Sequence, residues 1–569
     1  MVESSLGLQG RRGAGVPASI FRGNRPIAIL AAAIVSIGLA LRLSIAWQDL
    51  ETLTLKVVPD DAFYYFLTAD RISNGQNISF DGVTLSNGYH PLWLFFLVPL
   101  YLLPGRSLPL HLALTASSLF DVAAGGLIAL AVWKLTGNKV AGLFALTFYL
   151  LIPQNVFASV NGVESALAAM LLAALLLTLV LVWRQSRGDW IRWSVVTGVL
   201  GGLMVLARLD SALVLAAVLA VIAMFQSGAQ RWRAPLAAGS IAAVLVAPWF
   251  LWSFFTLGTV MPVSAESITW LLREHFSASH PDADIFDQVG QGLSYTRFIL
   301  LTRLPDLYFP AKPFAALFLS GMVLLGGHFL LLSKGPLRRR TASRILVAGL
   351  PLAAFAAMFL FNSSYRWLVR EWYFAWGVPV VALFVGVVFA YLDEVVASSA
   401  LSSGRQMGAV AVGTRQMLLY GALTGLLALA YVGPARDTWR TGHYPEQRER
   451  LQAALYLRSN TEPTARVAAF NAGVTGYFSD RTVINLDGVV NPDAYHALRE
   501  HRLLDYLRTV DVAYVADRDR AWRDLRAYIR PDDWSESLWG EDPNRSFVPV
   551  ATFGVDTLFG QMRVWRLTR

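Results

Sequence analysis

Long apolar segments, separated by short polar stretches, follow one another along most of the chain. The first is Pro26–Trp47, and ten further candidates lie at about 110–133, 140–158, 164–183, 192–207, 209–226, 234–256, 312–333, 344–361, 372–392 and 412–432. A helix of about 20 apolar residues crosses the hydrocarbon core of a bilayer. The pattern therefore predicts a polytopic α-helical membrane protein with about 11 transmembrane helices.

One further apolar segment, His90–Leu103, decides the predicted topology. If it lies along the outer interface, the inner loops and the N-terminal tail hold 18 basic against four acidic residues, whereas the outer connections hold about 10 basic against 15 acidic. Basic residues concentrate in cytoplasmic loops. We therefore expect an interfacial helix here, with the N-terminus in the cytoplasm and the C-terminal part outside. The alternative is a spanning segment at 90–103 that is balanced by another span.

The hydrophobic pattern changes in the last part of the chain. Two helical segments are predicted at Pro445–Asn460 and Ala494–Thr509, and they alternate with strand candidates at Arg466–Phe470, Thr482–Leu486, Val510–Ala516, Phe547–Thr552 and Gln561–Leu567. Such alternation is typical of a small, partly parallel sheet. We expect a cytoplasmic tail (1–25), a transmembrane domain (26–433) with long outer loops at 48–109 and 257–311, and a soluble extracytoplasmic α/β domain (434–569).

Composition agrees with a membrane protein. Hydrophobic residues make up 55% of the chain and charged residues 15%, against about 25% charged residues in soluble domains. The absence of cysteine excludes disulfides, thiolate metal sites and a cysteine nucleophile. From Gly433 onward there are 19 basic and 19 acidic residues, so the net charge of +9 belongs to the membrane part. The positive-inside rule explains this excess better than binding to nucleic acid does.

Asp60 and Asp61 follow the first apolar segment by about a dozen residues and lie among apolar and aromatic side chains. Burial and a neighbouring like charge both raise the pKa of a carboxyl group, which suits a general base. Two carboxylates also suit a divalent cation. The alternative is that Asp60 caps a helix starting at Ala62 while Asp61 is solvated.

Further polar residues gather at the outer ends of the apolar segments. His90 could contact a lipid phosphate or be a surface histidine, and Glu164 could be functional or only favour a helix start. Arg208 and Asp210 could form a structural ion pair. Asp121 is different, because it falls within a span, where an ionisable residue is either functional or a polar packing contact.

Two arginines flanked by tryptophan, Arg366 and Arg370, precede the tenth span. Guanidinium groups can bind phosphate bidentately, although arginines also extend to the interface for solvation alone. The chain contains no Walker motif, glycine-rich nucleotide fingerprint or HExxH motif. Nothing in the sequence therefore indicates that ATP supplies energy.

The order of these motifs resembles the GT-C membrane glycosyltransferases, which include the protein mannosyltransferases, the aminoarabinose transferases of lipid A and the Rgt-like bacterial enzymes. The resemblance rests on Asp60-Asp61-Ala-Phe-Tyr-Tyr-Phe, Asn74-Gly75, His90-Pro-Leu-Trp, Asn161-Gly-Val-Glu164, Ala207-Arg208-Leu-Asp210, Gly258…Pro262-Val-Ser264, Arg370-Glu-Trp-Tyr373, Asn471-Ala-Gly473 and Asn485-Leu-Asp487.

The resemblance implies an inverting transferase in a bacterial or archaeal plasma membrane, which moves a sugar from a polyprenyl-phosphate donor to a hydroxyl of a glycan, lipid or protein acceptor on the extracytoplasmic face. By the resemblance, Asp60 would be the base, and Asp61 would support it or help to hold a divalent metal. The donor phosphate would meet cationic side chains, namely His90, Arg208, Arg366 and Arg370. Supporting roles would fall to Glu164, Asp210, Tyr89 and Tyr373, and the acceptor side to Asn471 and Asp487.

Two other functional classes compete with this interpretation. A transporter or flippase for lipid-linked glycans would need polar residues through the middle of several spans, whereas here they cluster at the outer ends. A non-catalytic assembly protein would tolerate Asp60→Ala without loss of activity in cells.

Overall fold

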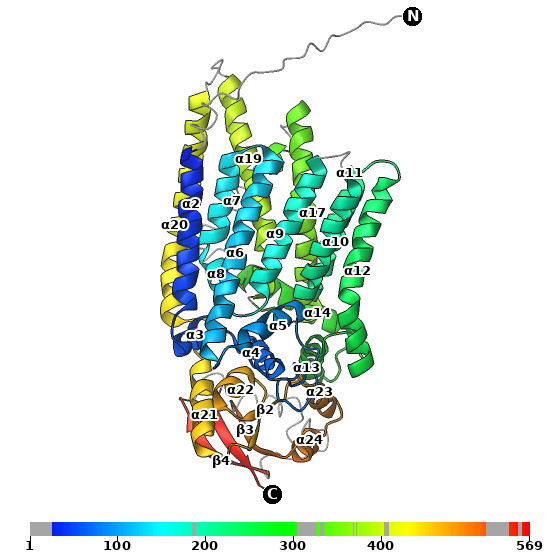
Figure 1. Ribbon diagram of the computed structural model, residues 1–569, viewed down its shortest axis with the longest axis vertical. Coiled ribbons are helices and arrows are strands. Elements are labelled where there is room, and N and C mark those ends of the chain that lie inside the picture. Colours follow the sequence, from blue (N-terminus) through cyan, green and yellow to red (C-terminus); the bar gives the residue numbers. More distant parts are fainter. Residues whose placement is uncertain are drawn as a thin grey trace, which may run out of the picture.

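The computed structural model describes residues 25–184, 189–303, 326–329, 335–367, 369–370, 372–402, 409–518, 546–555 and 560–568. A bundle of long helices forms one end of the molecule and a smaller α/β domain the other (Figure 1). The bundle contains α2 (Arg25–Ala46), α6 (Ser107–Thr136), α7 (Lys139–Leu151), α8 (Pro153–Ser159), α9 (Ser165–Arg184), α10 (Trp190–Ala207), α11 (Ala212–Phe225), α12 (Gln230–Leu257), α17 (Gly335–Ser364), α19 (Val378–Ser402) and α20 (Ala409–Thr441).

Within the described residues, eight helices are long and apolar enough to cross a membrane, or nine when the bent pair α7–α8 counts as one span. The shorter apolar α11 continues the 3-10 helix η2 (Leu209–Ser211). The predicted fold class, a polytopic helical membrane protein with a small sheet domain, is thus confirmed. The predicted span at 312–333 lies almost entirely outside the described residues. The span predicted at 372–392 is divided between α18 (Trp372–Ala375) and α19.

The segment at 90–103 forms α5 (Pro91–Leu97) and the 3-10 helix η1 (Val98–Leu102), of seven and five residues. This is too short to cross a bilayer, and α5 lies at the end of the bundle that faces the α/β domain (Figure 1). Trp93 anchors it, because the buried indole Nε1 donates to the Gly162 carbonyl oxygen at 2.9 Å.

Between the bundle and the α/β domain lie the helices of the two long loops. The first loop contains α3 (Leu50–Lys56) and α4 (Asp60–Ser73), and the second contains α13 (Val263–Ser279), α14 (Ile285–Phe298) and the π-helix η3 (Ile299–Arg303). The Asn87 side chain joins the two loops, since its Nδ2 donates to the Met261 carbonyl and its Oδ1 accepts from the Val263 amide, both at 2.9 Å.

The α/β domain holds a five-stranded sheet of order β2-β1-β3-β5-β4. β1 is parallel to β2 and β3, and β5 is antiparallel to β3 and β4. Its elements are α21 (Gln447–Asn460), β1 (Arg466–Ala469), α22 (Gly473–Ser479), β2 (Thr482–Asn485), α23 (Pro492–Arg499), α24 (Leu503–Thr509), β3 (Val512–Arg518), β4 (Phe547–Phe553) and β5 (Met562–Leu567).

Each predicted strand falls on one of these five strands, but two boundaries differ from the prediction. The single helix expected at 494–509 is two helices, α23 and α24. The expected domain start at 434 falls inside α20, which continues to Thr441 and contains Pro434 within its length.

A buried ion pair ties α2 to α6 inside the bundle. Arg42 and Asp121 are 0% and 1% exposed, and Arg42 Nη2 lies 2.6 Å from Asp121 Oδ2. The Tyr149 hydroxyl donates to the other Asp121 oxygen at 2.7 Å. Asp121 is therefore a polar packing contact, the second of the two roles that the sequence left open for it.

We expect Arg42→Met to lower the thermal unfolding temperature in detergent strongly, because removing one partner leaves a buried charge and costs about 3–5 kcal/mol. The double variant Arg42→Met/Asp121→Leu should recover much of that loss, and Leu119→Ala, at a 52% exposed position of α6, is the control. Equal unfolding temperatures for the single variant and the control would contradict this role.

Candidate active site

The first turn of α4 holds the α/β domain in place. Asp60 is 7% exposed, and its two carboxylate oxygens accept the backbone amides of Gly473 at 3.0 Å and Val474 at 2.8 Å. One turn later, the Tyr64 hydroxyl accepts from the Ala472 amide at 3.0 Å. Residues i and i+4 share one face of a helix, so this face of α4 binds three successive amides at the start of α22. Asp60 does not cap its own helix, which is the role that the alternative gave it.

Glycine is required where α22 meets α4. A Cβ atom on Gly473 would lie 2.0 Å from the Asp60 carbonyl oxygen, a backbone atom that cannot move aside as a flexible side chain can. The same kind of close approach occurs at Gly88, where a Cβ would lie 2.1 Å from the Val489 carbonyl oxygen. Both loops of the α/β domain that follow β1 and β2 therefore pack directly on the first outer loop.

Asp61 lies one residue further along α4 in a different setting. Its side chain is partly exposed, and no hydrogen bond or ion pair to it is found among the described residues. The pKa of Asp61 is raised to about 6, mainly by burial; Arg370 and Arg450 lower it, and the charges of Asp60 and Glu164 add to the increase. The Asp61 carboxylate thus accepts no hydrogen bond from the described residues.

A charged network lies beside Asp61. Arg208, 3% exposed, donates to both oxygens of Asp210 at 3.0 and 3.1 Å and to Glu164 at 2.8 Å. Tyr373 covers the guanidinium, whose carbon lies 5.2 Å from the ring centroid. The partly exposed His90 has its Nε2 3.6 Å from Glu164; desolvation lowers the pKa of this imidazole below its usual value, although Glu164 opposes the shift.

Close packing places Glu164 in this network. The loop before α9 contains Gly162, whose φ of +81° is unfavourable for other residues, and a Cβ there would lie 2.6 Å from the Phe66 ring of α4. Together with the Trp93 hydrogen bond to Gly162, this contact fixes the loop between α4 and α5.

The two arginines before α18 are less constrained than Arg208. Among the described residues, Arg366 makes two long hydrogen bonds, of 3.4 Å each, to Thr269 and Asn362. Arg370 is exposed, and no ion pair is found for either arginine within the described ranges. These two guanidinium groups are therefore available to an anion, whereas Arg208 is already neutralised by two carboxylates.

Asp487 reaches the site from the α/β domain. It follows β2 and lies between Asn485, whose Nδ2 donates to the Tyr64 hydroxyl at 3.3 Å, and Val489, which packs on Gly88. Burial raises the pKa of Asp487 to about 7, and the charges of Asp61 and Asp60 contribute to the shift. The Asn471 amide donates to Asp517 at 3.2 Å, next to the amides that Asp60 and Tyr64 bind.

One of the predicted supporting residues lies outside the charged network, and two residues near the site were not predicted. Tyr89 bonds to Thr68 at 2.7 Å and supports the loop before His90 instead of reaching the charged network. Tyr64 and Arg450 were not predicted; the spacing of Tyr64 from Asp60 could have indicated it, but nothing local distinguishes Arg450.

The residues do not fit the divalent metal that the sequence left open. Both oxygens of Asp60 accept backbone amides, and no group of three His, Cys, Asp or Glu that could hold an ion is found in the described part of the chain. We therefore assign no step to a metal.

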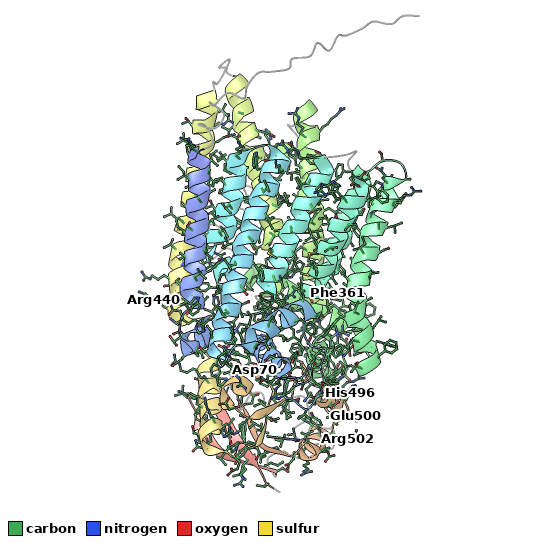
Figure 2. All side chains as sticks on the ribbon, viewed as in Figure 1. Asp70, Phe361, Arg440, His496, Glu500 and Arg502 are labelled. Carbon is green, nitrogen blue, oxygen red and sulfur yellow. The ribbon has the colours of Figure 1, made fainter. Side chains whose placement is uncertain are left out.

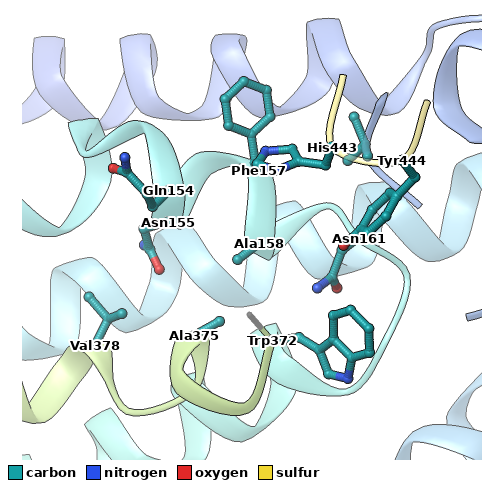
Figure 3. A pocket seen from close by; sticks show the side chains of 11 residues that line it. Gln154, Asn155, Phe157, Ala158, Asn161, Trp372, Ala375, Val378, His443 and Tyr444 are labelled. Atoms are coloured by element: carbon teal, nitrogen blue, oxygen red, sulfur yellow. The ribbon is translucent and has the colours of Figure 1, made fainter. Parts of the chain in front are cut away.

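A small cavity of about 40 Å³ lies beside this site, between α8, α18 and the linker to the α/β domain (Figure 3). Phe157, Asn161 and Trp372 contribute to its lining, and it has room for roughly one or two water molecules. Asn161 begins the loop that carries Glu164, so the cavity and the charged network share this loop.

Comparisons with known proteins confirm the fold. A family model described as a domain of unknown function (DUF8728) matches residues 438–563, and no curated protein matches the chain. ArnT from Cupriavidus metallidurans bound to undecaprenyl phosphate has a TM-score of 0.53 at 13% identity, and the match covers 94% of this chain and 97% of that one. Its apo state also has a TM-score of 0.53, at 14% identity, covering 94% and 98%.

A more distant match is the oligosaccharyltransferase AglB from Archaeoglobus fulgidus in complex with an inhibitory peptide and a dolichol-phosphate, with a TM-score of 0.47 at 15% identity, covering 93% of this chain and 74% of that one. The matches to ArnT show that this chain shares the fold of that protein, in agreement with the resemblance that the order of the motifs indicated.

We expect Gly473→Ala to destabilise the contact between α4 and the α/β domain by about 1–3 kcal/mol, since the added methyl group overpacks the Asp60 carbonyl. Limited proteolysis of the linker at 442–446 should become faster. Gly290→Ala is the control, because a Cβ at that position meets nothing within 4 Å; identical cleavage rates for the two variants would be inconsistent with a tight interface.

Proposed function

We propose that this protein is a membrane glycosyltransferase that moves a sugar from a polyprenyl-phosphate donor to an acceptor hydroxyl, with inversion and with Asp61 as the general base. The sequence favoured Asp60 for this role. The observation that carries the proposal is the contrast between the two carboxylates: Asp60 accepts two amides, whereas Asp61 is partly exposed and free of such donors within the described residues.

In the proposed reaction, Asp61 takes the proton of the acceptor hydroxyl, and the oxygen attacks the anomeric carbon of the donor. The bond from that carbon to the phosphate oxygen breaks as the new glycosidic bond forms, so a single displacement inverts the configuration. The electron pair of the broken bond leaves on the polyprenyl phosphate. Arg366 and Arg370 stabilise this developing charge, because fixed cations aimed at a leaving group lower the barrier.

The remaining site residues hold these groups in position. Arg208 keeps Glu164 and Asp210 together and orients the wall that faces Tyr373, while Asp487 and Asn471 approach from the α/β domain on the acceptor side. A neutral His90 is suited to donate or accept one hydrogen bond rather than to neutralise phosphate, because burial disfavours its cationic form.

The site is proposed to face the extracytoplasmic side. It lies at the end of the bundle next to the α/β domain, whereas Arg344 and Arg415, which pair with Glu394 and Asp393, lie at the opposite end. Basic residues at one end of a bundle are typical of the cytoplasmic face. A transporter is less well supported, because the buried Arg42 and Asp121 pair with each other rather than with a passing ligand.

We expect Asp61→Asn to lower transfer by roughly 10²–10⁴-fold, because an amide cannot accept the proton, while the unfolding temperature changes little. Asp60→Asn should lower the unfolding temperature as well, since one amide donor would then face an NH₂ group. Purified protein with a radiolabelled polyprenyl-phosphate sugar measures transfer, and Glu462→Gln, at an exposed position of the α/β domain, is the control. Full turnover by Asp61→Asn would exclude the proposed base.

The pH dependence of transfer and of stability should have opposite signs. Transfer should rise as the pH increases through about 6, the raised pKa of Asp61, because only the ionised form accepts a proton. The folded state binds more protons than the unfolded chain between the usual carboxyl pKa of 3.8 and the raised values of about 6 and 7. The free energy of unfolding should therefore fall as the pH rises through this window, and Asp487→Asn should reduce that fall. A pH-independent rate between 5 and 8 in wild type would contradict the assignment.

A further inference from the structure

A long apolar groove lies along the bundle and is lined by none of the residues of the candidate active site. Its volume is about 610 Å³, and its walls come from α2, the α7–α8 pair and α20, which lie at one edge of the bundle (Figure 1). The groove exists because α7 and α8 meet at an angle of 61°, so the chain turns at Pro153 and cannot fill the space between α2 and α20. No charged side chain is found among the described residues that line it.

The size of the groove matches one hydrocarbon chain. Its lining runs from Thr424 to Trp439 on α20 and from Ile37 to Gln48 along α2 and the turn that follows. At 1.5 Å per residue these stretches are roughly 16 to 22 Å long, close to the depth of one leaflet of a hydrocarbon core that is about 30 Å thick. The volume equals that of about 20 water molecules at roughly 30 Å³ each, which leaves room for an acyl chain.

Aromatic rings close the groove at the end next to the α/β domain. Phe157 and Trp439 stack there with ring centroids 6.3 Å apart, and the His443 ring lies 5.0 Å from Phe157. Amphipathic aromatic side chains of this kind favour the boundary between acyl chains and head groups. This end is therefore the head-group end of the groove.

Positive charge surrounds the head-group end. Lys56 Nζ lies 4.6 Å from the centroid of the Trp439 ring, and the side chain of Arg440, the next residue of α20, extends outward from the bundle (Figure 2). No acidic partner is found for Lys56 or Arg440 among the described residues. The nearest acidic groups on these helices pair with other arginines, Asp437 with Arg436 and Glu51 with Arg448. An anionic head group is complementary to the rim that Lys56 and Arg440 form at this end, whereas a zwitterionic head group is attracted to it less strongly.

We propose that the groove binds one acyl chain of an anionic phospholipid from the leaflet next to the α/β domain, with the phosphate at Lys56 and Arg440. The occupant is a phospholipid because the groove is one leaflet long, whereas a polyprenyl chain is much longer. This lipid fills the space that the turn at Pro153 opens and supports the end of α20, from which the linker leads to the α/β domain. The inference does not depend on the proposed transfer reaction.

Native mass spectrometry of the full chain, titrated with phosphatidylglycerol or phosphatidylcholine, tests this site. We expect phosphatidylglycerol to bind about tenfold or more tightly than phosphatidylcholine, given two basic residues near the head group. Ala428→Trp fills the groove and should abolish this binding. Leu429→Trp is the matched control, because the neighbouring residue is 83% exposed and does not line the groove.

A second variant keeps the test independent of packing inside the bundle. Lys56→Gln/Arg440→Gln changes only the rim and should reduce the affinity for phosphatidylglycerol to that for phosphatidylcholine. Equal binding by wild type and by a folded Ala428→Trp, or no preference for phosphatidylglycerol in wild type, would overturn the proposal. Displacement of phosphatidylglycerol by undecaprenyl phosphate would overturn it too, since the groove would then hold an isoprenoid chain.

Discussion

The carboxylate of Asp60, held by two amides at the start of α22, is the contact on which the rest of the site depends. It joins the first residue of a helix at the membrane end to a loop of the α/β domain across 414 positions in the sequence. A carboxylate at a helix N-terminus satisfies amides that have no partner within the helix. The contact therefore combines a favourable charge interaction with directional hydrogen bonds that fix the position of α22 relative to α4. It determines where β1 and β2 end relative to α4, and hence that Asp487 lies near Asp61.

The charged side chains of the site form two groups, one whose members pair with one another and one whose members have few partners. Arg208, Glu164 and Asp210 satisfy one another, which is how buried charges are usually stabilised. Asp61, Arg366 and Arg370 are instead left with few partners in the described structure. These three charged side chains are partly or fully exposed, and they lie where two domains and a short interfacial helix meet. A ligand that brings a hydroxyl to Asp61 and a phosphate to the arginines would supply the missing partners.

The groove between α2, the α7–α8 pair and α20 follows a different physical rule. In the active site, polar groups are positioned by specific hydrogen bonds, whereas the groove results from a helix that bends away from its neighbours. In water such an apolar surface would be covered by protein, but in a bilayer a lipid chain can cover it at little cost. Phe157 belongs to the lining of both the groove and the small cavity beside Asn161, so the two spaces adjoin at α8.

The sequence by itself determined the elements: the apolar segments, the five strands, the short helix at 90–103 and the polar clusters at the outer ends of the spans. These depend on local periodicity and charge, which are readable in a window of a few residues. It did not determine which of Asp60 and Asp61 is free, because neighbouring residues on a helix have the same local sequence but point about 100° apart. Only the tertiary structure decided this, since the amides that bind Asp60 come from the far end of the chain, as do Asp487 and Arg450.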